Sequence, residues 1–169
     1  MRTIQDYPLN TQRIEECEPM ENKSKDGKKY EKVVEEILTK YSKHKFEVQY
    51  SHHTLPDGTK QIPDILLTEL DEILSLKTQT VSGTVDQKIA HELSILQDTV
   101  EAGNASKATI VLHGDGWNPK VKSSYMDPNH RFRKVCPDVD VIVHDEFLRR
   151  YTTKEVVDRK DGLDKFYDT

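Results

Sequence analysis

The sequence predicts one α/β domain, in which a central mixed β-sheet is flanked by helices on both faces. Apolar residues recur at three- and four-residue steps in residues 26–44 and again in residues 85–100, which indicates two amphipathic helices. Short β-rich runs lie between and after them, so the order is helix, strands, helix, strand, strand, helix. Such an order is typical of a sheet covered by helices on both sides. With 169 residues in the chain, we expect a single domain over residues 25–169.

Residues 1–24 are polar and carry no period, so we expect an amino-terminal arm there. The first helix follows over residues 26–44, and its apolar stripe consists of Tyr30, Val33, Val34, Ile37, Leu38 and Tyr41. FEVQY at residues 46–50 alternates as a short strand does, and LPDGT at residues 55–59 supplies a turn.

A hairpin is predicted next. PDILLT at residues 63–68 and ILSLKTQ at residues 73–79 are two β-rich runs separated by an acidic turn at residues 70–72. SGT at residues 82–84 ends the second run. Thr84 and Gln87 then form a capping box for the helix of residues 85–100, which ends at Gly103 and Asn104.

The remaining chain predicts two more strands, ATIVLH at residues 108–113 and VDVIV at residues 139–143. We expect a Gly- and Pro-bearing loop over residues 114–130 between them. The segments DEFLRRY (145–151) and KEVVDRK (154–160) predict terminal helices. A second Pro-Asp pair at residues 137–138 is followed by Asp158-Arg159-Lys160, but we reject it as a site because the lysine falls on a helix end.

The composition limits the classes of function. A net charge of −5 argues against coating nucleic acid by bulk charge, although a local basic face remains compatible with it. Cys17 and Cys136 are too few and too dispersed for a disulfide framework or a zinc site. The chain has no signal-like start and no run of roughly 18 apolar residues. We therefore expect a cytoplasmic protein that does not contact a membrane.

Asp64 and Lys77 are the first candidate site residues. They begin and end neighbouring strands of the predicted hairpin, so a modest register offset brings both to one side of the sheet. A carboxylate that holds Mg²⁺ and a lysine that orients water are the minimum for phosphodiester hydrolysis. The alternative is an ordinary exposed ion pair. Lys77 ends an apolar run, Gln79 shares its side, and Glu31 flanks the first helix's stripe, which favours a functional site.

These segments resemble the PD-(D/E)xK nuclease superfamily. The matching stretches are GKKYEKVVEEIL (27–38), IPD (62–64), SLKTQ (75–79) and TVDQKIAHEL (84–93), and the resemblance covers residues 26–147. It implies a restriction-endonuclease-like fold and a Mg²⁺ cofactor that Mn²⁺ replaces. It also implies a role for each matching residue: Asp64 binds the metal, Lys77 is catalytic, Gln79 shapes the site, Glu31 is the first-helix acid, and the backbone carbonyl of Leu76 is a further metal ligand.

Ser75 departs from this pattern, because the superfamily most often has Glu or Asp at its position. A hydroxyl is a weak, neutral ligand for a hard cation. Glu31 or Glu92 could supply the missing acid, although for Glu92 we favour an ordinary ion pair with Lys88 one turn earlier. Ser75 is also compatible with a catalytically impaired relative that still binds DNA.

The most basic stretch of the chain is expected to contact DNA. Residues 118–136 contain one acid, Asp127, and aromatic side chains interleave with the basic ones. A loop of this kind suits phosphate contact and groove recognition, and the alternative is a solvated loop. The candidate DNA-binding residues are Lys120, Lys122, Arg131, Arg133 and Lys134.

Together these features predict a metal-dependent DNA endonuclease whose residues 25–169 form a single nuclease domain. We expect a sequence-specific type II restriction enzyme that acts on double-stranded DNA as a homodimer, with a heteromeric partner as the other possibility. A catalytically impaired DNA-binding or partner subunit and a structure-specific or repair nuclease remain the alternatives.

Overall fold

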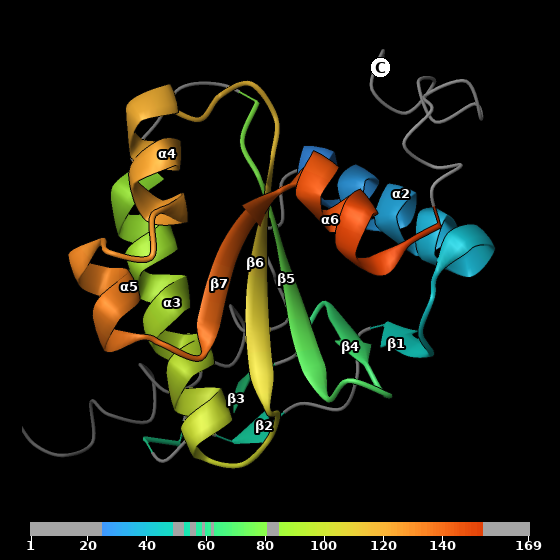
Figure 1. Ribbon diagram of the computed structural model, residues 1–169, viewed down its shortest axis with the longest axis horizontal. Helices are drawn as coiled ribbons and strands as arrows, with labels where there is room; N and C mark the ends of the chain where they lie inside the picture. Colours follow the sequence, from blue (N-terminus) through green and yellow to red (C-terminus); the bar gives the residue numbers. More distant parts are fainter. Residues whose placement is uncertain are drawn as a thin grey trace, which may run out of the picture.

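The computed structural model describes residues 25–48, 53–54, 57–58, 60–61, 63–80 and 85–153. Its centre is a five-stranded mixed sheet in the order β1-β4-β5-β6-β7 (Figure 1). The strands are β1 (Phe46–Val48), β4 (Ile65–Leu67), β5 (Glu72–Thr78), β6 (Lys107–His113) and β7 (Val139–Val143). Two further short strands, β2 (His53–Thr54) and β3 (Lys60–Gln61), pair only with each other.

Five helices accompany the sheet within the described residues. They are α2 (Lys25–Tyr41), α3 (Val85–Glu101), α4 (Pro119–Met126), α5 (Arg131–Val135) and α6 (His144–Tyr151). Helices α2 and α6 lie on one side of the sheet, and α3, α4 and α5 lie on the other (Figure 1). The predicted α/β architecture, a mixed sheet flanked by helices, is confirmed.

The strand directions place several strand ends at one edge of the sheet. β4 pairs antiparallel with both β1 and β5, so the predicted hairpin of β4 and β5 is confirmed. β6 and β7 then run parallel to β5, and α3 makes the crossover from β5 to β6. The carboxyl ends of these three parallel strands therefore lie together.

The core consists of two apolar clusters, one on each face of the sheet. In the first, the stripe of α2 and the inner face of α6 cover β4 and β5, as the spacing of apolar residues in residues 26–44 predicts. In the second, α3 and α4 cover the opposite face. Alternation along β5 divides its side chains between the two: Leu74 and Leu76 belong to the first cluster and Ile73 to the second.

The buried acid of β5 belongs to the fold. Glu72 faces α6, where its Oε1 accepts hydrogen bonds from Thr109 Oγ1 at 2.7 Å and from the Tyr151 hydroxyl at 2.8 Å. Lys107 Nζ lies 3.6 Å from the same oxygen. Burial and the neighbouring Glu72 raise the pKa of Tyr151 to about 12, despite the opposing hydrogen bond with Thr109. Glu72 therefore holds β5, β6 and α6 together.

The expectation of one continuous loop over residues 114–130 is wrong, because α4 occupies residues 119–126 and α5 begins at Arg131. Asn118 caps α4 by accepting hydrogen bonds from the backbone N–H groups of Lys120 and Val121, and Pro119 occupies the first turn. An Asn followed by Pro is a signal for the start of a helix, whereas the prediction from the sequence assigned both residues to a loop.

Several other predicted elements differ from the observed ones only at their ends. The turn of the hairpin covers residues 68–71, so Glu72 already belongs to β5. The first helix ends at Tyr41 rather than at residue 44. The amino-terminal arm, Thr84 of the expected capping box and the segment 154–160 lie outside the described residues.

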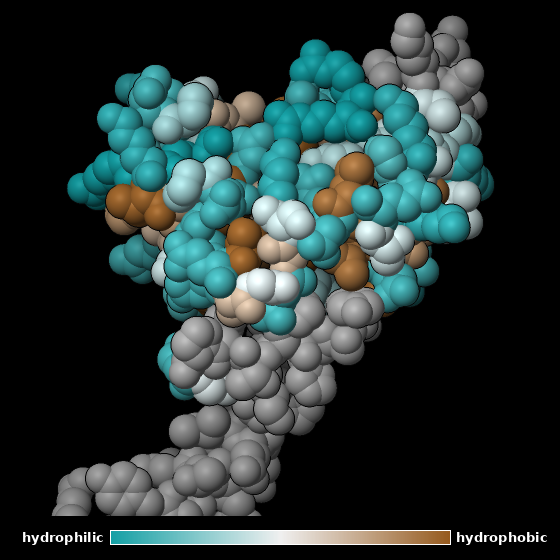
Figure 2. Space-filling model, turned by 60° about the horizontal axis from the view of Figure 1, so that its bottom comes forward, coloured by the Kyte–Doolittle hydropathy of each residue, from teal (hydrophilic) through white to brown (hydrophobic). Residues whose placement is uncertain are grey.

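The surface seen from below Figure 1 is largely hydrophilic over the described part of the chain. Its apolar side chains form separate patches between polar ones (Figure 2). Among the helices that the structure describes, none combines the length and the hydrophobicity that a membrane span requires.

Gln79 joins the end of β5 to the segment that follows β6. Its backbone N–H donates to the His113 carbonyl at 3.0 Å, and its carbonyl accepts from the Gly116 N–H at 2.8 Å. Gly114 lies between these contacts with φ of +100°. A Cβ atom at residue 114 would stand 2.3 Å from the Gln79 carbonyl oxygen, so only glycine fits there.

Replacing Gly114 by alanine should therefore destabilise the protein more than the same change at Gly103. Gly103 also has a positive φ, but nothing lies within 4 Å of its would-be Cβ. Gly103→Ala should cost about 1–2 kcal/mol of backbone strain, and Gly114→Ala about 1–3 kcal/mol more from overlap. Urea unfolding of both variants measures the difference. Equal losses would mean that the contact with Gln79 imposes no constraint.

Candidate functional site

The candidate site begins where the hairpin ladder ends. The described pairing of β4 with β5 stops at Ile65 and Leu74, so the same register sets Asp64 opposite Ser75 and Pro63 opposite Leu76. Asp64 Oδ2 accepts a hydrogen bond from the Leu76 N–H at 2.8 Å. A side-chain carboxylate thus takes the place of a backbone acceptor at this step of the ladder.

Pro63 explains how the Leu76 carbonyl becomes a candidate ligand. In a β-strand the N–H and C=O of one residue point toward the same neighbouring strand. Because the Leu76 N–H points to Asp64, the Leu76 carbonyl also points toward the β4 side. A proline at residue 63 has no N–H to donate to it. The Pro-Asp pair therefore frees a carbonyl oxygen beside a carboxylate.

Ser75 and Lys77 lie on the face of the sheet that α3 covers. They alternate with Leu74 and Leu76, whose side chains pack on the opposite face. Register and alternation set Asp64 on the same face as Ser75 and Lys77, because cross-strand partners share a face. The convergence of the Asp64 and Lys77 side chains on a common ligand stays a prediction.

Glu92 of α3 contacts the side chains of Ser75 and Lys77 from the helical layer that covers this face of the sheet. Its Oε1 accepts a hydrogen bond from Ser75 Oγ at 2.7 Å, and its Oε2 lies 3.2 Å from Lys77 Nζ. The Glu92 side chain is 14% exposed. A carboxylate therefore lies beside the serine that stands in the acid position of the motif.

The favoured interpretation of Glu92 as the partner of Lys88 is wrong. In the part of the chain that the structure describes, its ion pair is with Lys77 of β5, in the sheet layer on which α3 packs. The sequence did contain a signal. Glu92 lies between Ile89, Leu93 and Leu96 on the apolar stripe of α3, where a carboxylate needs a partner on the sheet.

Glu31 occupies a different layer. It is half-buried on α2, which packs on the face opposite to α3. Its neighbour Tyr30 stacks on His113 with ring centroids 4.0 Å apart and hydrogen-bonds His144 Nδ1 at 2.8 Å. Burial lowers the pKa of His113, although Asp115 opposes the shift. Among the contacts that the structure describes at Ser75 and Lys77, the helical carboxylate is therefore Glu92 of α3 and not Glu31 of α2.

Gln79 continues the line of Ser75 and Lys77 along β5, and it is buried. Its Nε2 donates to the Gly116 carbonyl at 3.3 Å, beside the backbone contacts described above. The side chain therefore fixes the segment between β6 and α4 next to the candidate site. The site-shaping role expected of Gln79 stays a prediction.

The basic stretch divides into exposed cations and one structural arginine. Lys120, Arg131 and Lys134 are exposed and Lys122 is half-buried. Arg133 is different, because its side chain is only 9% exposed and donates to the Tyr125 carbonyl and to Asp140, each within 2.8 Å. We therefore leave Arg133 out of the residues proposed to contact DNA.

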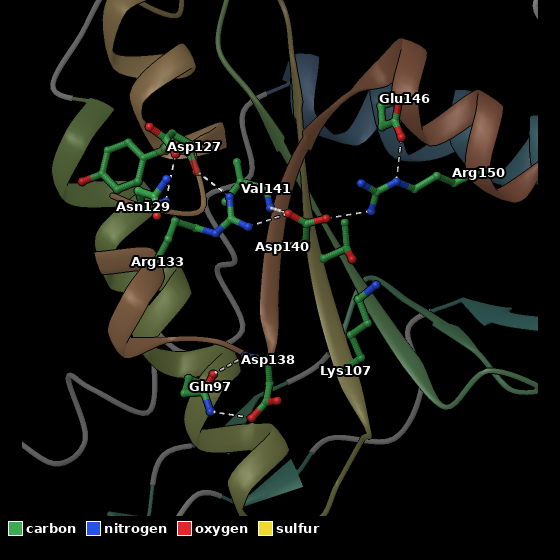
Figure 3. A network of polar contacts seen from close by, with 12 residues as sticks. Gln97, Lys107, Asp127, Asn129, Arg133, Asp138, Asp140, Val141, Glu146 and Arg150 are labelled. Atoms are coloured by element: carbon green, nitrogen blue, oxygen red, sulfur yellow. Dashed lines mark hydrogen bonds and ion pairs between the residues drawn. The ribbon is translucent and has the colours of Figure 1, made fainter. Parts of the chain in front are cut away.

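Asp140 is the centre of this internal network (Figure 3). It lies on β7, and its two oxygens bind Arg133 of α5 and Arg150 of α6, both at 2.7 Å. Burial alone would raise the pKa of Asp140, but the hydrogen bond with Arg150 and the two guanidinium charges outweigh it and lower the pKa. The network links the helical layers of both faces around the edge of the sheet.

The donor set near Lys77 suits a hard divalent cation. Asp64 and Glu92 offer carboxylate oxygens and Leu76 offers a carbonyl oxygen, which are the atoms that Mg²⁺ prefers. Mg²⁺ usually keeps several waters and takes only one or two carboxylates. Within the described residues, no group of three or more His, Cys, Asp or Glu side chains is arranged around a common metal position. The fit is therefore to a cation that retains water.

Comparison with known proteins gives no relative for this chain. No protein-family model matches it, and neither the curated proteins nor the solved structures contain a significant match.

Asp140→Asn should lower stability and flatten its dependence on pH. Because the folded pKa of Asp140 is lowered, its carboxylate stabilises the fold above the unfolded value of about 4, and this stabilisation is lost as pH falls through the folded pKa. Near pH 7 the variant should lose about 3 kcal/mol, since two arginines lose their counter-charge.

Urea unfolding between pH 3 and pH 7 measures both effects. Asp98→Asn is the matched control, because Asp98 is an exposed aspartate of α3. If the two variants have the same pH profile, Asp140 contributes nothing beyond an ordinary surface acid.

Proposed function

We propose that this protein is a metal-dependent DNA endonuclease of the PD-(D/E)xK type, with Glu92 in the role of the missing acid. The observation that carries the proposal is the contact of Glu92 with both Ser75 and Lys77, next to Asp64. Ser75 is too short and neutral to replace the acid itself, but it positions a carboxylate that comes from α3.

Each residue has a distinct task in this proposal. Asp64, Glu92 and the Leu76 carbonyl would hold Mg²⁺, with Mn²⁺ as a substitute, and the cation when bound would polarise the phosphodiester and acidify water. Lys77 orients the attacking water and balances the negative charge that develops on phosphate. Ser75 donates to Glu92 Oε1 and so keeps Oε2 toward Lys77. Gln79 fixes the adjoining segment through Gly116.

The topology supports the restriction-endonuclease-like fold that the motif implies. Helix α2 precedes three antiparallel strands, and α3 then crosses over to β6, which runs parallel to β5. The proposed site lies at the carboxyl end of β5, where the strand leaves the core. This arrangement presents the acid, the lysine and the carbonyl at one edge of the sheet.

DNA is the proposed substrate because exposed cations gather on the α3 side of a net acidic chain. Lys120, Lys122, Arg131 and Lys134 are available for phosphate contact, whereas Arg133 is engaged with Asp140. We propose sequence-specific cleavage of double-stranded DNA by a homodimer, as in type II restriction enzymes, in the cytoplasm. A catalytically impaired DNA-binding or partner subunit and a structure-specific or repair nuclease are outcomes that the tests below separate.

Asp64→Ala and Lys77→Ala should each abolish Mg²⁺- or Mn²⁺-dependent nicking of supercoiled plasmid. The expected loss is about 10²–10⁴-fold, because each removes a group that acts directly on the reacting phosphate or water. Thermal unfolding checks that both variants remain folded. If both cut as the wild type does, the active site lies elsewhere. If the wild type binds DNA but never cuts it, the chain is an impaired subunit.

A second experiment tests which acid completes the site. Glu92→Gln removes the charge while keeping the shape, and it should reduce both Mn²⁺ affinity and cleavage by about 10²-fold or more. Glu31→Gln is the matched control on the other face of the sheet, and it should cut nearly normally. Ser75→Ala should lose about tenfold or less, because a positioning hydrogen bond is worth about 1 kcal/mol.

The opposite pattern would contradict this assignment. If Glu31→Gln abolished cleavage while Glu92→Gln still cleaved DNA, the acid that completes the site would be Glu31 of α2. A Ser75→Ala as inactive as Asp64→Ala would make the hydroxyl itself a ligand or a catalytic group. Ser75→Glu should keep metal binding if the acid position tolerates a carboxylate from either element.

A further inference from the structure

A cleft of about 420 Å³ opens on the outer side of α3, where α4 and α5 pack against it. Gln87 and Ala90 of α3 form one wall, and α4 and α5 form the others. These three helices form one layer on the same face of the sheet as Glu92 (Figure 1). A cleft of this size is within the range of small-ligand sites.

The charge of the cleft is one-sided. Lys120 of α4 and Arg131 of α5 line it, and no Asp or Glu is among the lining residues. Both cations are exposed, and neither forms an ion pair within the part of the chain that the structure describes. In a protein with a net charge of −5, such a cleft is suited to an anionic ligand.

Aromatic rings also line the cleft, beside Val121 and Ser124 of α4. Tyr125, His130 and Phe132 contact one another, with ring centroids 4.4 to 6.2 Å apart. The Arg131 guanidinium lies 4.8 Å from the centre of the Phe132 ring. His130 Nδ1 accepts a hydrogen bond from the Phe132 N–H at 3.2 Å, which fixes the orientation of the imidazole. Flat rings and a guanidinium plane are the groups on which nucleobases stack.

The cleft adjoins the proposed catalytic site through α3. Gln87 precedes Glu92 by five residues, which is about 7.5 Å along a helix axis. Because Glu92 points to the sheet and Gln87 lines the cleft, the two lie on different sides of the same helix. A nucleic-acid strand that crosses the amino-terminal part of α3 could therefore reach both.

We propose that this cleft binds one unstacked nucleotide of a DNA strand. The base stacks on the half-buried rings of His130 and Phe132, and the exposed Lys120 and Arg131 hold the flanking phosphates. The proposal rests on the proposed function, because it specifies how the same protein holds its DNA substrate. It differs from reading base edges in a groove, since a cleft of about 420 Å³ between α3, α4 and α5 has room for a single base and not for a duplex.

Fluorescence anisotropy with a labelled single-stranded oligo(dT) of 12 nucleotides, in EDTA, tests the site without cleavage. Lys120→Ala and Arg131→Ala should each weaken binding about tenfold and lower the log–log salt slope by about 0.7. Phe132→Leu, which keeps the apolar volume, should weaken binding about 5- to 100-fold and leave the slope unchanged. Lys40→Ala on α2 and Arg149→Ala on α6 are matched controls on the other face, and they should bind normally.

An abasic strand of equal length and charge isolates the base. The wild type should bind it at least about fivefold more weakly than oligo(dT), and Phe132→Leu should bind both strands equally. The proposal is overturned if the wild type does not bind oligo(dT), if it does not distinguish the abasic strand, or if the control variants lose as much affinity. Competition by free dTMP as strong as by the oligonucleotide would also overturn it, since the cleft would then serve a mononucleotide.

Cleavage assays on the same cleft variants separate this proposal from the proposed function, because oligonucleotide binding is measured in EDTA and does not depend on metal-dependent cleavage. If the wild type never cleaves DNA but the cleft variants still lose oligonucleotide binding, the nucleotide site stands and the nuclease assignment fails.

Discussion

The ion pair between Glu92 and Lys77, with Ser75 bound to the same carboxylate, constrains the arrangement of this whole region. Burying a carboxylate on the apolar stripe of α3 costs free energy of folding unless the sheet provides a cation or a hydrogen-bond donor. The partner comes from the end of β5, where an apolar strand turns into a lysine. Packing of Ile89 and Leu93 brings α3 to the sheet, and the ion pair fixes how the helix is rotated there.

β5 is central to the structure because one of its faces packs in the core and the other presents polar side chains. Toward α2 and α6 it offers Leu74 and Leu76 to the core, and toward α3 it offers Ser75 and Lys77. Pro63 ends the hydrogen-bond ladder between β4 and β5 at the same point. Beyond Leu74, β5 therefore has both polar side chains and a backbone carbonyl without a ladder partner on β4. A central strand that ends in polar groups thus provides a rigid base for a proposed site, which places chemical groups more accurately than a loop does.

Much of the fold could be predicted because it follows from periodicity. The stripes of the two long helices and the alternation of the hairpin strands indicated the correct elements. Two of the predictions that failed depended on contacts between distant parts of the chain. Glu92 has a possible partner one turn away in Lys88, and no local pattern reveals that Lys77 lies closer in space. Arg133 belongs to a run of cations, yet Asp140 on a later strand makes it structural. The helix at Pro119–Met126 did have a local signal, the Asn-Pro start.

The separation of Glu92 from Ser75 and Lys77 along the chain also has a consequence for assembly. The hairpin could form early from local pairing, but on its own it would supply only Asp64 of the two carboxylates in the proposed site. The second carboxylate arrives when α3 docks, so a cation that required both would bind only the completed tertiary structure. Its binding free energy would then add to the docking of α3 onto the sheet. In the proposed nuclease, a nascent or partly unfolded chain would accordingly lack the complete metal site, and both the metal site and the rigid packing of α3 would form in the same step.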